Sequence, residues 1–187
     1  MEETVATGCV VKLDRGFPLV RLEDGRELRC KHATSLVKGE RVRAVIGDRV
    51  RVSFAERNDK ALIVEVLPRT RELVRKDPTE RAVPQVLAAN FDRVIVTQPS
   101  TEVNMRRLER ELVLAHETGA AVSVVLTKAD LAESEDEVAR VRERVLALVG
   151  ADVETLVVSE AMPESVEAVR ALVPEGTTAV LIGRSGV

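Results

Sequence analysis

The spacing of apolar residues changes near residue 90, and this change restricts what the chain can fold into. Short apolar runs separated by turn residues occupy positions 5–67, whereas strand-like runs alternate with segments of helical spacing from Phe91 onward. The first pattern is typical of small barrels, and the second of a parallel sheet covered by helices. The 187 residues have room for one large domain or two small ones, at roughly 100–200 residues per domain.

The N-terminal part, residues 1–68, is predicted to be a small β-barrel. Five strands are expected, at residues 5–13, 17–22, 26–31, 49–54 and 61–67. The Asp24-Gly25 pair is a strong hairpin signal, and a longer connection follows the third strand. This pattern favours a five-stranded oligonucleotide-binding (OB) fold. An SH3-like barrel is the alternative, because strand count alone does not settle the topology.

Residues 69–90 are predicted to be a linker, since Pro68, Pro78 and Pro84 discourage a long helix or a central strand. Residues 91–187 are predicted to form a partial α/β domain with a parallel sheet. Its strands are expected at 91–97, 120–126, 153–158 and 178–182, and its helices at 104–118, 134–149 and 163–173. In such sheets, ligands bind outside the carboxyl ends of the strands.

Composition excludes several classes of protein. The chain has 28 basic and 31 acidic residues and a net charge of −3, which argues against a disordered acidic tail or a histone-like polycation. Apolar runs fall short of the roughly 20 residues that span a bilayer, so no membrane partner is expected. The acidic N-terminus argues against secretion, and Cys9 and Cys30 suggest neither a disulfide framework nor a metal site. A cytoplasmic protein is expected.

Basic residues are dense between positions 30 and 51, which contain six lysines and arginines but only two acidic residues, Glu40 and Asp48. The cluster is a candidate RNA-binding surface, because clustered cations contact phosphates. Its members are Lys31, Lys38, Arg41, Arg43, Arg49 and Arg51. The alternative is a solvated barrel face with Arg on alternate strand positions. Aromatic residues are 2% of the chain, which disfavours a row of stacking rings.

The second strand of the α/β part ends in Thr127-Lys128-Ala129-Asp130, which fits the pattern [N/T]-K-x-D of guanine recognition in GTPases. A carboxylate at the Asp130 position can accept from both guanine N1–H and the N2 amino group, a pattern that adenine does not offer. The Lys128 stem can cover the purine plane, and the Thr127 hydroxyl can tie this loop to a phosphate loop. The alternative is a polar loop in which Asp130 caps a helix.

The next two strands end in segments of related chemistry. Ser159 lies where GTPases carry Ser-Ala beside the guanine base, with Glu160 in place of the usual Ala. The fourth strand ends in Gly183-Arg184-Ser185-Gly186-Val187, the first five positions of a phosphate loop G-x-x-x-x-G-K-[S/T]. Read singly, these are a loop serine and a Gly-Ser turn. Three matches at successive strand ends favour a nucleotide site.

Base recognition precedes the phosphate loop, the reverse of the order in most GTPases. With a small barrel in front, the chain resembles the RsgA/YjeQ family of circularly permuted, ribosome-dependent GTPases. Further similar segments are GDRV at 47–50, RELVRK at 71–76, QVLAANFDRV at 85–94, NMRRLERELVLA at 104–115 and VLTKADL at 125–131. The resemblance implies an OB-fold barrel and a circularly permuted P-loop GTPase domain, of which this chain holds part.

The resemblance also implies function. Family members bind GTP or GDP with Mg²⁺ and hydrolyse GTP on the small ribosomal subunit during its late assembly. The barrel is expected to contact ribosomal RNA, and the complete protein to be a monomer. Guanine nucleotide would be bound by residues that match the family's motifs. These are Thr127, Lys128, Asp130, Ser159, Gly183, Arg184, Ser185, Gly186 and Val187.

The chain departs from the family pattern after Val187, where the phosphate-loop Lys, the Mg²⁺-binding hydroxyl, two switch segments and a C-terminal zinc-binding domain would follow. No catalytic residue is therefore assigned here, and these 187 residues alone are expected not to hydrolyse GTP. One alternative is an RNA-binding barrel module on a non-catalytic α/β scaffold. Another is a plain interaction domain without a nucleotide.

Overall fold

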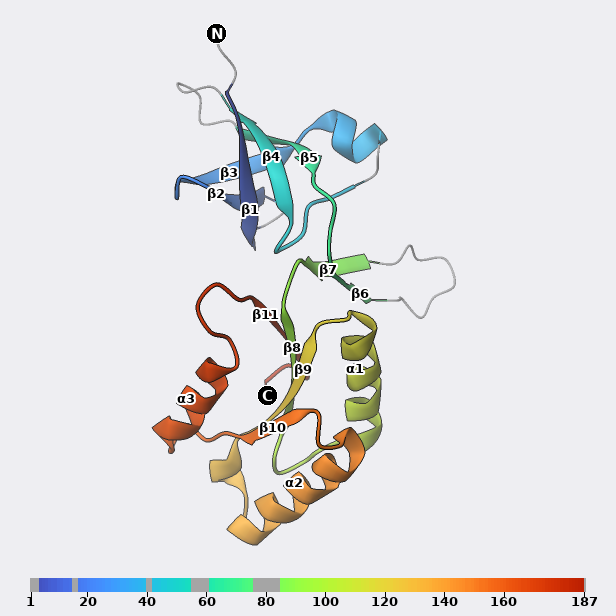
Figure 1. Ribbon diagram of the computed structural model, residues 1–187, viewed down its shortest axis with the longest axis vertical. Helices are drawn as coiled ribbons and strands as arrows, with labels where there is room; N and C mark the ends of the chain where they lie inside the picture. The colour runs from blue at the N-terminus through green and yellow to red at the C-terminus, as the bar shows by residue number, and fades with distance from the viewer. Residues whose placement is uncertain (1–3, 15–16, 40–41, 55–60, 76–84, 187) are drawn as a thin grey trace. The chain divides into compact units, whose positions relative to one another are not determined.

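The computed structural model describes residues 4–14, 17–39, 42–54, 61–75 and 85–186. The chain forms two compact units, Met1–Asn90 and Phe91–Val187, which we call the barrel unit and the α/β unit (Figure 1). The second unit begins where the sequence pattern changes. The segment predicted as a linker, 69–90, groups with the barrel.

The barrel unit contains a closed barrel with strand order β1-β2-β3-β5-β4. The strands are β1 Thr4–Asp14, β2 Phe17–Leu22, β3 Glu27–His32, β4 Arg49–Phe54 and β5 Ala61–Val66. β3 and β5 are parallel and the other neighbours antiparallel. This order is that of the OB fold, which confirms that prediction over the SH3-like alternative. Alternate residues of each strand fill the barrel, among them the fully buried Val20, Val50 and Ile63.

The long connection after β3 contributes to this core. A single π-helical turn, Ser35–Gly39, places Leu36 among the barrel residues with 1% of its surface exposed. The backbone N–H of Ala44 donates to Nε2 of His32 at 3.0 Å. His32 is half-buried, and burial, followed by the charge of Arg43, lowers its pKa below the usual value. The connection is thus fastened to the end of β3.

Two short strands lie in the segment predicted as a linker. β6 (Glu72–Arg75) and β7 (Gln85–Ala89) pair antiparallel, and Leu73, Ala88 and Ala89 are buried. Ile46 of the barrel connection forms an isolated parallel bridge with Ala88. The described residues of this segment form no helix, and Pro68 precedes β6, whereas Pro78 and Pro84 lie outside the described residues.

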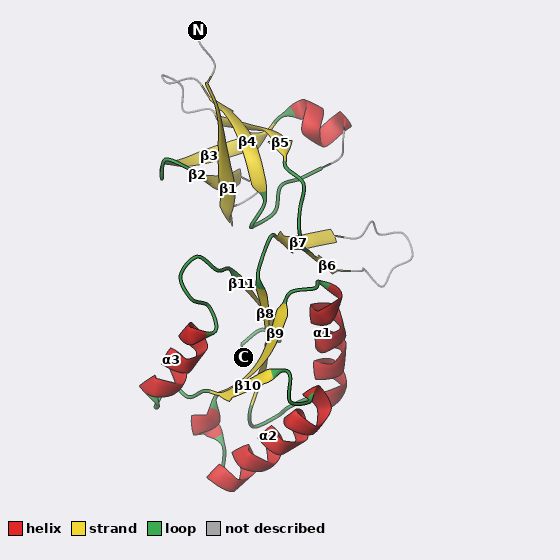
Figure 2. Cartoon of the chain, viewed as in Figure 1, coloured by secondary structure: helices red, strands yellow, loops and turns green. Residues whose placement is uncertain are grey.

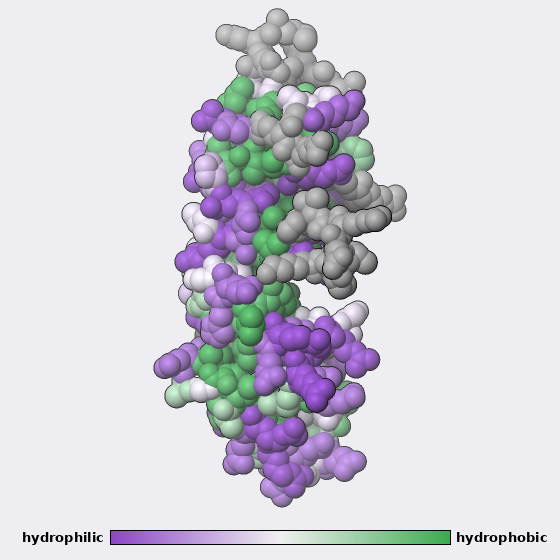
Figure 3. All heavy atoms as spheres, turned by 90° about the vertical axis from the view of Figure 1, so that its right-hand side faces the viewer, coloured by the Kyte–Doolittle hydropathy of each residue, from purple (hydrophilic) through white to green (hydrophobic). Residues whose placement is uncertain are grey.

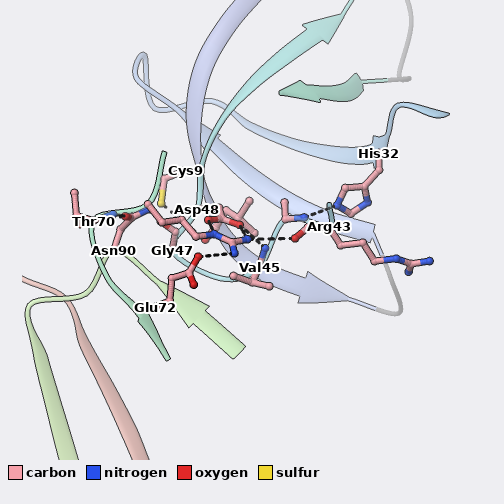
Figure 4. A network of polar contacts seen from close by, with 12 residues as sticks. Cys9, His32, Arg43, Val45, Gly47, Asp48, Thr70, Glu72 and Asn90 are labelled. Carbon is pink, nitrogen blue, oxygen red and sulfur yellow. Dashed lines mark hydrogen bonds and ion pairs between the residues drawn. The ribbon is translucent and has the colours of Figure 1, made fainter. Parts of the chain in front are cut away.

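The turn Gly47-Asp48 joins this hairpin to the barrel (Figure 4). Asp48 is completely buried, and its carboxylate accepts from Nε and Nη2 of Arg69 at 2.7 and 2.8 Å and from the N–H of Val45 at 2.8 Å. The side-chain amide of Asn90 donates to the Gly47 carbonyl at 3.0 Å. Gly47 has φ 87°, and a Cβ there would collide with the Ala89 carbonyl. Both ends of 69–90 therefore dock on one turn.

The α/β unit is built on a four-stranded sheet of order β10-β9-β8-β11 in which every pair is parallel. The strands are β8 Arg93–Pro99, β9 Ala121–Thr127, β10 Glu154–Val157 and β11 Ala179–Gly183. The two central strands are the most buried, with Val94, Val96 and Val124 fully enclosed. Continuous apolar runs are expected for strands that are covered on both faces.

Three helices cover the sheet, and α1 and α3 lie on opposite sides of it (Figures 1 and 2). They are α1 Met105–Glu117, α2 Glu135–Val149 and α3 Pro163–Ala171. Asn104 and Ser134, at which two of the predicted helices begin, are N-caps, because Asn104 Oδ1 accepts from Arg107 N–H and Ser134 Oγ accepts from Glu137 N–H. Hydrophilic side chains dominate the outer side of α1 and α2 (Figure 3). No helix in the described ranges is long and apolar enough to cross a membrane.

Candidate functional site

The predicted nucleotide residues follow three strands of the parallel sheet. β9 ends at Thr127, β10 at Val157 and β11 at Gly183. Because parallel strands point the same way, these carboxyl ends share one edge of the sheet, where ligands of α/β proteins bind. The sheet itself thus brings the three motif loops to one edge.

The loop after β9 is sharply bent. Lys128 has the left-handed conformation, with φ 59° and ψ 37°, and a single 3₁₀ turn, Ala129–Leu131, follows it. The N–H of Ala129 donates to the Val158 carbonyl at 3.2 Å, which ties this loop to the segment after β10. A left-handed non-glycine residue is costly, and such residues gather at functional sites. The bend leaves Asp130 exposed at the edge of the sheet.

Ser159 and Asp130 come into direct contact from neighbouring strand ends. The buried hydroxyl of Ser159 donates to Oδ1 of Asp130 at 2.8 Å and accepts from Ala161 N–H at 3.1 Å. The N–H of Ser159 donates at 3.1 Å to Oγ of Ser165, which lies in the first turn of α3. This hydrogen bond fixes Ser159 against α3. Asp130 is therefore oriented by a side chain that is itself fixed. Its carboxylate keeps most of its acceptor capacity, since a carboxylate has about four lone-pair sites.

The contacts of Thr127 and Lys128 differ from the expected ones. The Thr127 hydroxyl donates to the Gln98 carbonyl of β8 at 3.5 Å and does not reach residues 183–186. The link to the phosphate-loop segment comes from Lys128, whose Nζ donates to the Gly186 carbonyl. The Lys128 stem consequently spans from the β9 loop to the β11 loop.

The segment after β11 depends on two glycines. A Cβ at Gly183 would collide with the hydroxyl of Thr97, and the Thr97 hydroxyl donates to the Ile182 carbonyl at 3.1 Å. Gly186 has φ 81°, a conformation that favours glycine. Ser185 is exposed between them. Val187 lies outside the described residues.

Arg184 lines a cavity of about 140 Å³ on the α1 side of this loop. Its other lining residues are Gln98, Pro99, Glu102, Asn104 and Arg107. Arg107 is itself held by Glu111, whose carboxylate accepts from Arg107 Nε at 2.7 Å and from Gln98 Nε2 at 2.6 Å. Arg184, a position predicted for phosphate contact, thus borders a cavity that residues at the start of α1 also line.

The predicted RNA-binding cations lie in the barrel unit, and part of their charge is matched by nearby carboxylates. Arg49 forms an ion pair with Glu23 at 3.3 Å, and Arg51 with Glu65 at 3.4 Å. The side chains of Lys31, Lys38 and Arg43 are exposed, and Arg41 lies outside the described residues. These pairs support the alternative of a solvated barrel face at β4.

Phe17 is an exposed ring that the sequence did not single out. It opens β2 and lies beside Lys31 of β3, with Lys31 Nζ 5.6 Å from the ring centroid. Its position in the sequence, directly after the turn-favouring residues Asp14-Arg15-Gly16, was the available signal, since strand ends beside loops often carry binding residues.

Comparison with known proteins identifies the family. The family model described as RsgA GTPase matches residues 66–187 of the chain. The chain belongs to the RsgA GTPase family. This confirms the resemblance that the order of the motifs indicated.

Curated relatives carry the name small ribosomal subunit biogenesis GTPase RsgA. The protein from Streptomyces coelicolor is 37% identical over 193 residues, covering 98% of this chain and 49% of the relative. The protein from Xanthomonas campestris is 39% identical over 145 residues, covering 77% of this chain and 38% of the relative. The chain therefore spans half or less of the length of these relatives.

Solved structures show the same fold. YjeQ from Thermotoga maritima matches with a TM-score of 0.73 at 23% identity, covering 98% of this chain and 62% of that one. YloQ, described as a circularly permuted GTPase, matches with a TM-score of 0.70 at 19% identity, with 98% and 61% covered. An RsgA-type barrel followed by a partial, circularly permuted α/β unit is thus the fold of this chain.

Proposed function

We propose that this chain forms the guanine-recognising and RNA-contacting part of a GTPase that acts in the biogenesis of the small ribosomal subunit. Its RsgA relatives bear that name, and the chain spans half or less of their length. The observation that carries the proposal is the Ser159–Asp130 contact of 2.8 Å at the carboxyl edge of the sheet. This contact fixes a carboxylate where a base can reach it.

Asp130 supplies the specificity for guanine. With Oδ1 held by Ser159, the carboxylate can accept from the N1–H and N2 amino groups of guanine in a bidentate, charge-assisted pair. Adenine has no proton on N1 and no amino group at C2. The fixed carboxylate would then face the N1 lone pair, and two acceptors that face each other without a donor lose the hydrogen bonds that each makes with water.

Lys128 and the backbone after Ser159 complete the base site. The Lys128 stem, anchored at the Gly186 carbonyl, forms an apolar wall for the purine plane. Within the described part of the chain, the N–H of Glu160 donates to no acceptor, so it is available to guanine O6. A Glu in place of Ala leaves this N–H unchanged, so the departure from the family pattern at position 160 preserves the contact.

The segment Gly183–Gly186 would begin the phosphate cradle, where backbone N–H groups face an anion. GTP with Mg²⁺ is the nucleotide that a GTPase of this family uses. The printed sequence stops before the positions of the phosphate-loop Lys and the Mg²⁺-binding hydroxyl. The described residues show no cluster of three or more His, Cys, Asp or Glu that could hold a metal.

The barrel is the part that we expect to contact ribosomal RNA. OB folds bind oligonucleotides on the outer face of strands 2 and 3 and on the adjoining loops. Lys31 and Lys38 are exposed for phosphate contacts. Phosphate-driven binding falls steeply with salt. A monomeric, cytoplasmic protein remains our expectation.

NMR titration with GMP and AMP tests the base site without requiring phosphate-loop residues beyond Val187. We expect GMP to shift the amide signals of residues 127–130 and 159–161, and AMP to shift them far less. Equal shifts with both nucleotides, or shifts confined to other segments, would contradict the proposal.

Co-sedimentation of the chain with isolated small ribosomal subunits tests the second half of the proposal, the contact with the ribosomal subunit. Binding to large subunits alone would contradict that half.

A further inference from the structure

Phe17 lies on the outside of the barrel, unlike the other two phenylalanines of the chain. It is 39% exposed, whereas Phe54 is 6% and Phe91 0% exposed. Phe17 opens β2, and its neighbour Pro18 points inward and is buried. A single exposed apolar side chain is common on protein surfaces, so the ring is informative only together with the groups around it.

Positive charge surrounds this ring. Lys31 Nζ lies 5.6 Å from the ring centroid, and among the described residues Lys31 pairs with no carboxylate. Lys12 and Arg29 share one carboxylate, that of Asp14, at 3.8 and 3.4 Å. Among the described residues, these three cations and one anion give the strands beside the ring a net charge of +2. The strands β2 and β3 that carry Phe17, Arg29 and Lys31 are neighbours in the barrel (Figure 1).

Apolar side chains extend the surface onto β5. Leu62 is paired with Lys31 across the parallel β3–β5 ladder and is 37% exposed. Val64, on the same outer side of β5, is also 37% exposed. We call Phe17, Lys31 and Leu62, with Lys12 and Arg29 at its margin, the Phe17 face. It combines an exposed ring (Phe17), an exposed apolar side chain (Leu62) and positive charge that the described carboxylates only partly balance.

We propose that the Phe17 face binds an unpaired RNA base, stacked on the Phe17 ring, while Lys31 contacts the adjoining phosphate. This rests on the RNA contact of the proposed function and goes beyond it, because it specifies single-stranded or looped RNA. A duplex buries its base faces in the helical stack, so an isolated ring gains little from it. Lys31 is exposed, and its cation–π contact is weak enough for the ammonium to turn to a phosphate.

The net charge of +2 disfavours an apolar protein segment as the partner. The ring adjoins the cations, and this arrangement favours RNA over an acidic protein segment, because each nucleotide presents a base beside a phosphate. Paired ring and cation contacts of this kind are the usual design of OB folds that bind single strands. The surface also differs from the β4 arginines, whose guanidinium groups already face Glu23 and Glu65. Among the described residues of the barrel strands, the unmatched positive charge thus lies on the Phe17 face.

Fluorescence anisotropy of the full 187-residue chain with labelled RNA tests this. The probes are a single-stranded oligouridylate of about 12 nucleotides, within the site size of one OB fold, and a duplex of the same length. Phe17→Leu keeps apolar bulk but removes the ring, and Phe17→Trp keeps a ring. Val113→Ala, at a 60% exposed site on α1, is the matched control. Circular dichroism verifies that each variant is folded.

We expect the wild-type chain to prefer the single strand. Phe17→Leu should weaken its binding about five- to hundredfold, with Phe17→Trp and Val113→Ala close to wild type. Lys31→Gln should lower the salt slope, d log K/d log [salt], by about 0.7. If Phe17→Leu and the wild type bind single-stranded RNA equally well, or if the wild type prefers the duplex, base stacking on Phe17 is wrong. RNA binding by the barrel would still stand in either case. Binding of neither RNA would overturn both, and base recognition by Asp130 would be unaffected.

Discussion

The carboxylate of Asp48, completely buried, accepts two hydrogen bonds from the guanidinium of Arg69 at 2.7 and 2.8 Å. The two residues are 21 positions apart, and their contact fastens the β6–β7 hairpin to the barrel. The Arg69 side chain is 14% exposed, so both charges lie largely out of water. Asp48 also raises the pKa of Arg69, which stays charged at every ordinary pH. Breaking such a pair leaves an uncompensated buried charge.

We therefore expect Arg69→Met to lower the free energy of unfolding by about 3–5 kcal/mol, as measured by urea denaturation. Arg49→Met is the matched control, because the Arg49–Glu23 pair is exposed and worth about 0–1 kcal/mol. The double variant Asp48→Asn/Arg69→Met should recover part of the loss, since no charge is then left buried. Equal losses for Arg69→Met and Arg49→Met would contradict this account of the turn.

His32 makes the stability of the barrel unit depend on pH. Its Nε2 accepts from Ala44 N–H at 3.0 Å, which only a neutral imidazole does, and burial and Arg43 lower its pKa. Below the unfolded-state pKa of about 6.5, the unfolded chain binds the proton more readily than the folded one. His32 thus contributes stability above about pH 6.5 that is lost as the pH falls toward its lowered folded-state pKa.

His32→Gln should flatten the fall of the unfolding free energy between about pH 7 and pH 5. His116→Gln, at an exposed position on α1, leaves the His32–Ala44 contact intact and should keep the wild-type slope. Urea denaturation at several pH values measures both. A His32→Gln profile that parallels the wild type would show that another group carries the dependence.

Gly183 is expected to tolerate no side chain. A Cβ there would collide with the Thr97 hydroxyl, and it would lie 2.6 Å from the Thr97 carbonyl oxygen, so β11 would have to shift away from β8. Gly183→Ala should cost about 1–3 kcal/mol of unfolding free energy and weaken the response to GMP. Ser185→Ala, two residues on and exposed, should change stability little. Unchanged stability in Gly183→Ala would mean that the two strands do not approach so closely.

The local features of the fold were predictable from sequence, because they depend on neighbouring residues. Asn104 and Ser134, at which two helices were predicted to begin, cap α1 and α2. Each strand of the α/β unit lies within a few residues of its apolar run. The β6–β7 hairpin was not predictable. Its position depends on Asp48 and Gly47, which are remote in sequence, and its prolines favoured a linker.

The candidate site likewise has features that the sequence predicted and features that it did not. The order of the motifs predicted that Asp130 and Ser159 would follow strands of one parallel sheet and lie at the same edge of it. Their direct hydrogen bond was not predicted. The partner of Lys128 is set by how the β11 loop folds back, which no spacing reveals. The register between β4 and β5 places Arg51 opposite Glu65, and the sequence did not reveal this register. It decides how much of the positive charge in the predicted basic cluster is left without a nearby carboxylate.

A polypeptide of these 187 residues should show no GTP hydrolysis above background. Phosphoryl transfer needs charge stabilisation by the phosphate-loop Lys and by Mg²⁺, and this sequence supplies neither the Lys nor the hydroxyl ligand. Phosphate release with and without small ribosomal subunits measures this. Turnover that survives repeated purification and is lost in Asp130→Asn would contradict the prediction.

The base preference of Asp130→Asn tests the central claim most directly. An Asn amide can donate to the C2 carbonyl of xanthine, which stands where guanine carries its amino group, so the preference should move from GMP to XMP. Glu133→Gln, an exposed carboxylate three residues on, is the control and should keep the preference for GMP. NMR titration of the three proteins with both nucleotides gives the answer. A shift of preference to XMP in Asp130→Asn alone is the predicted result, and an unchanged order of GMP and XMP would contradict guanine recognition by this carboxylate.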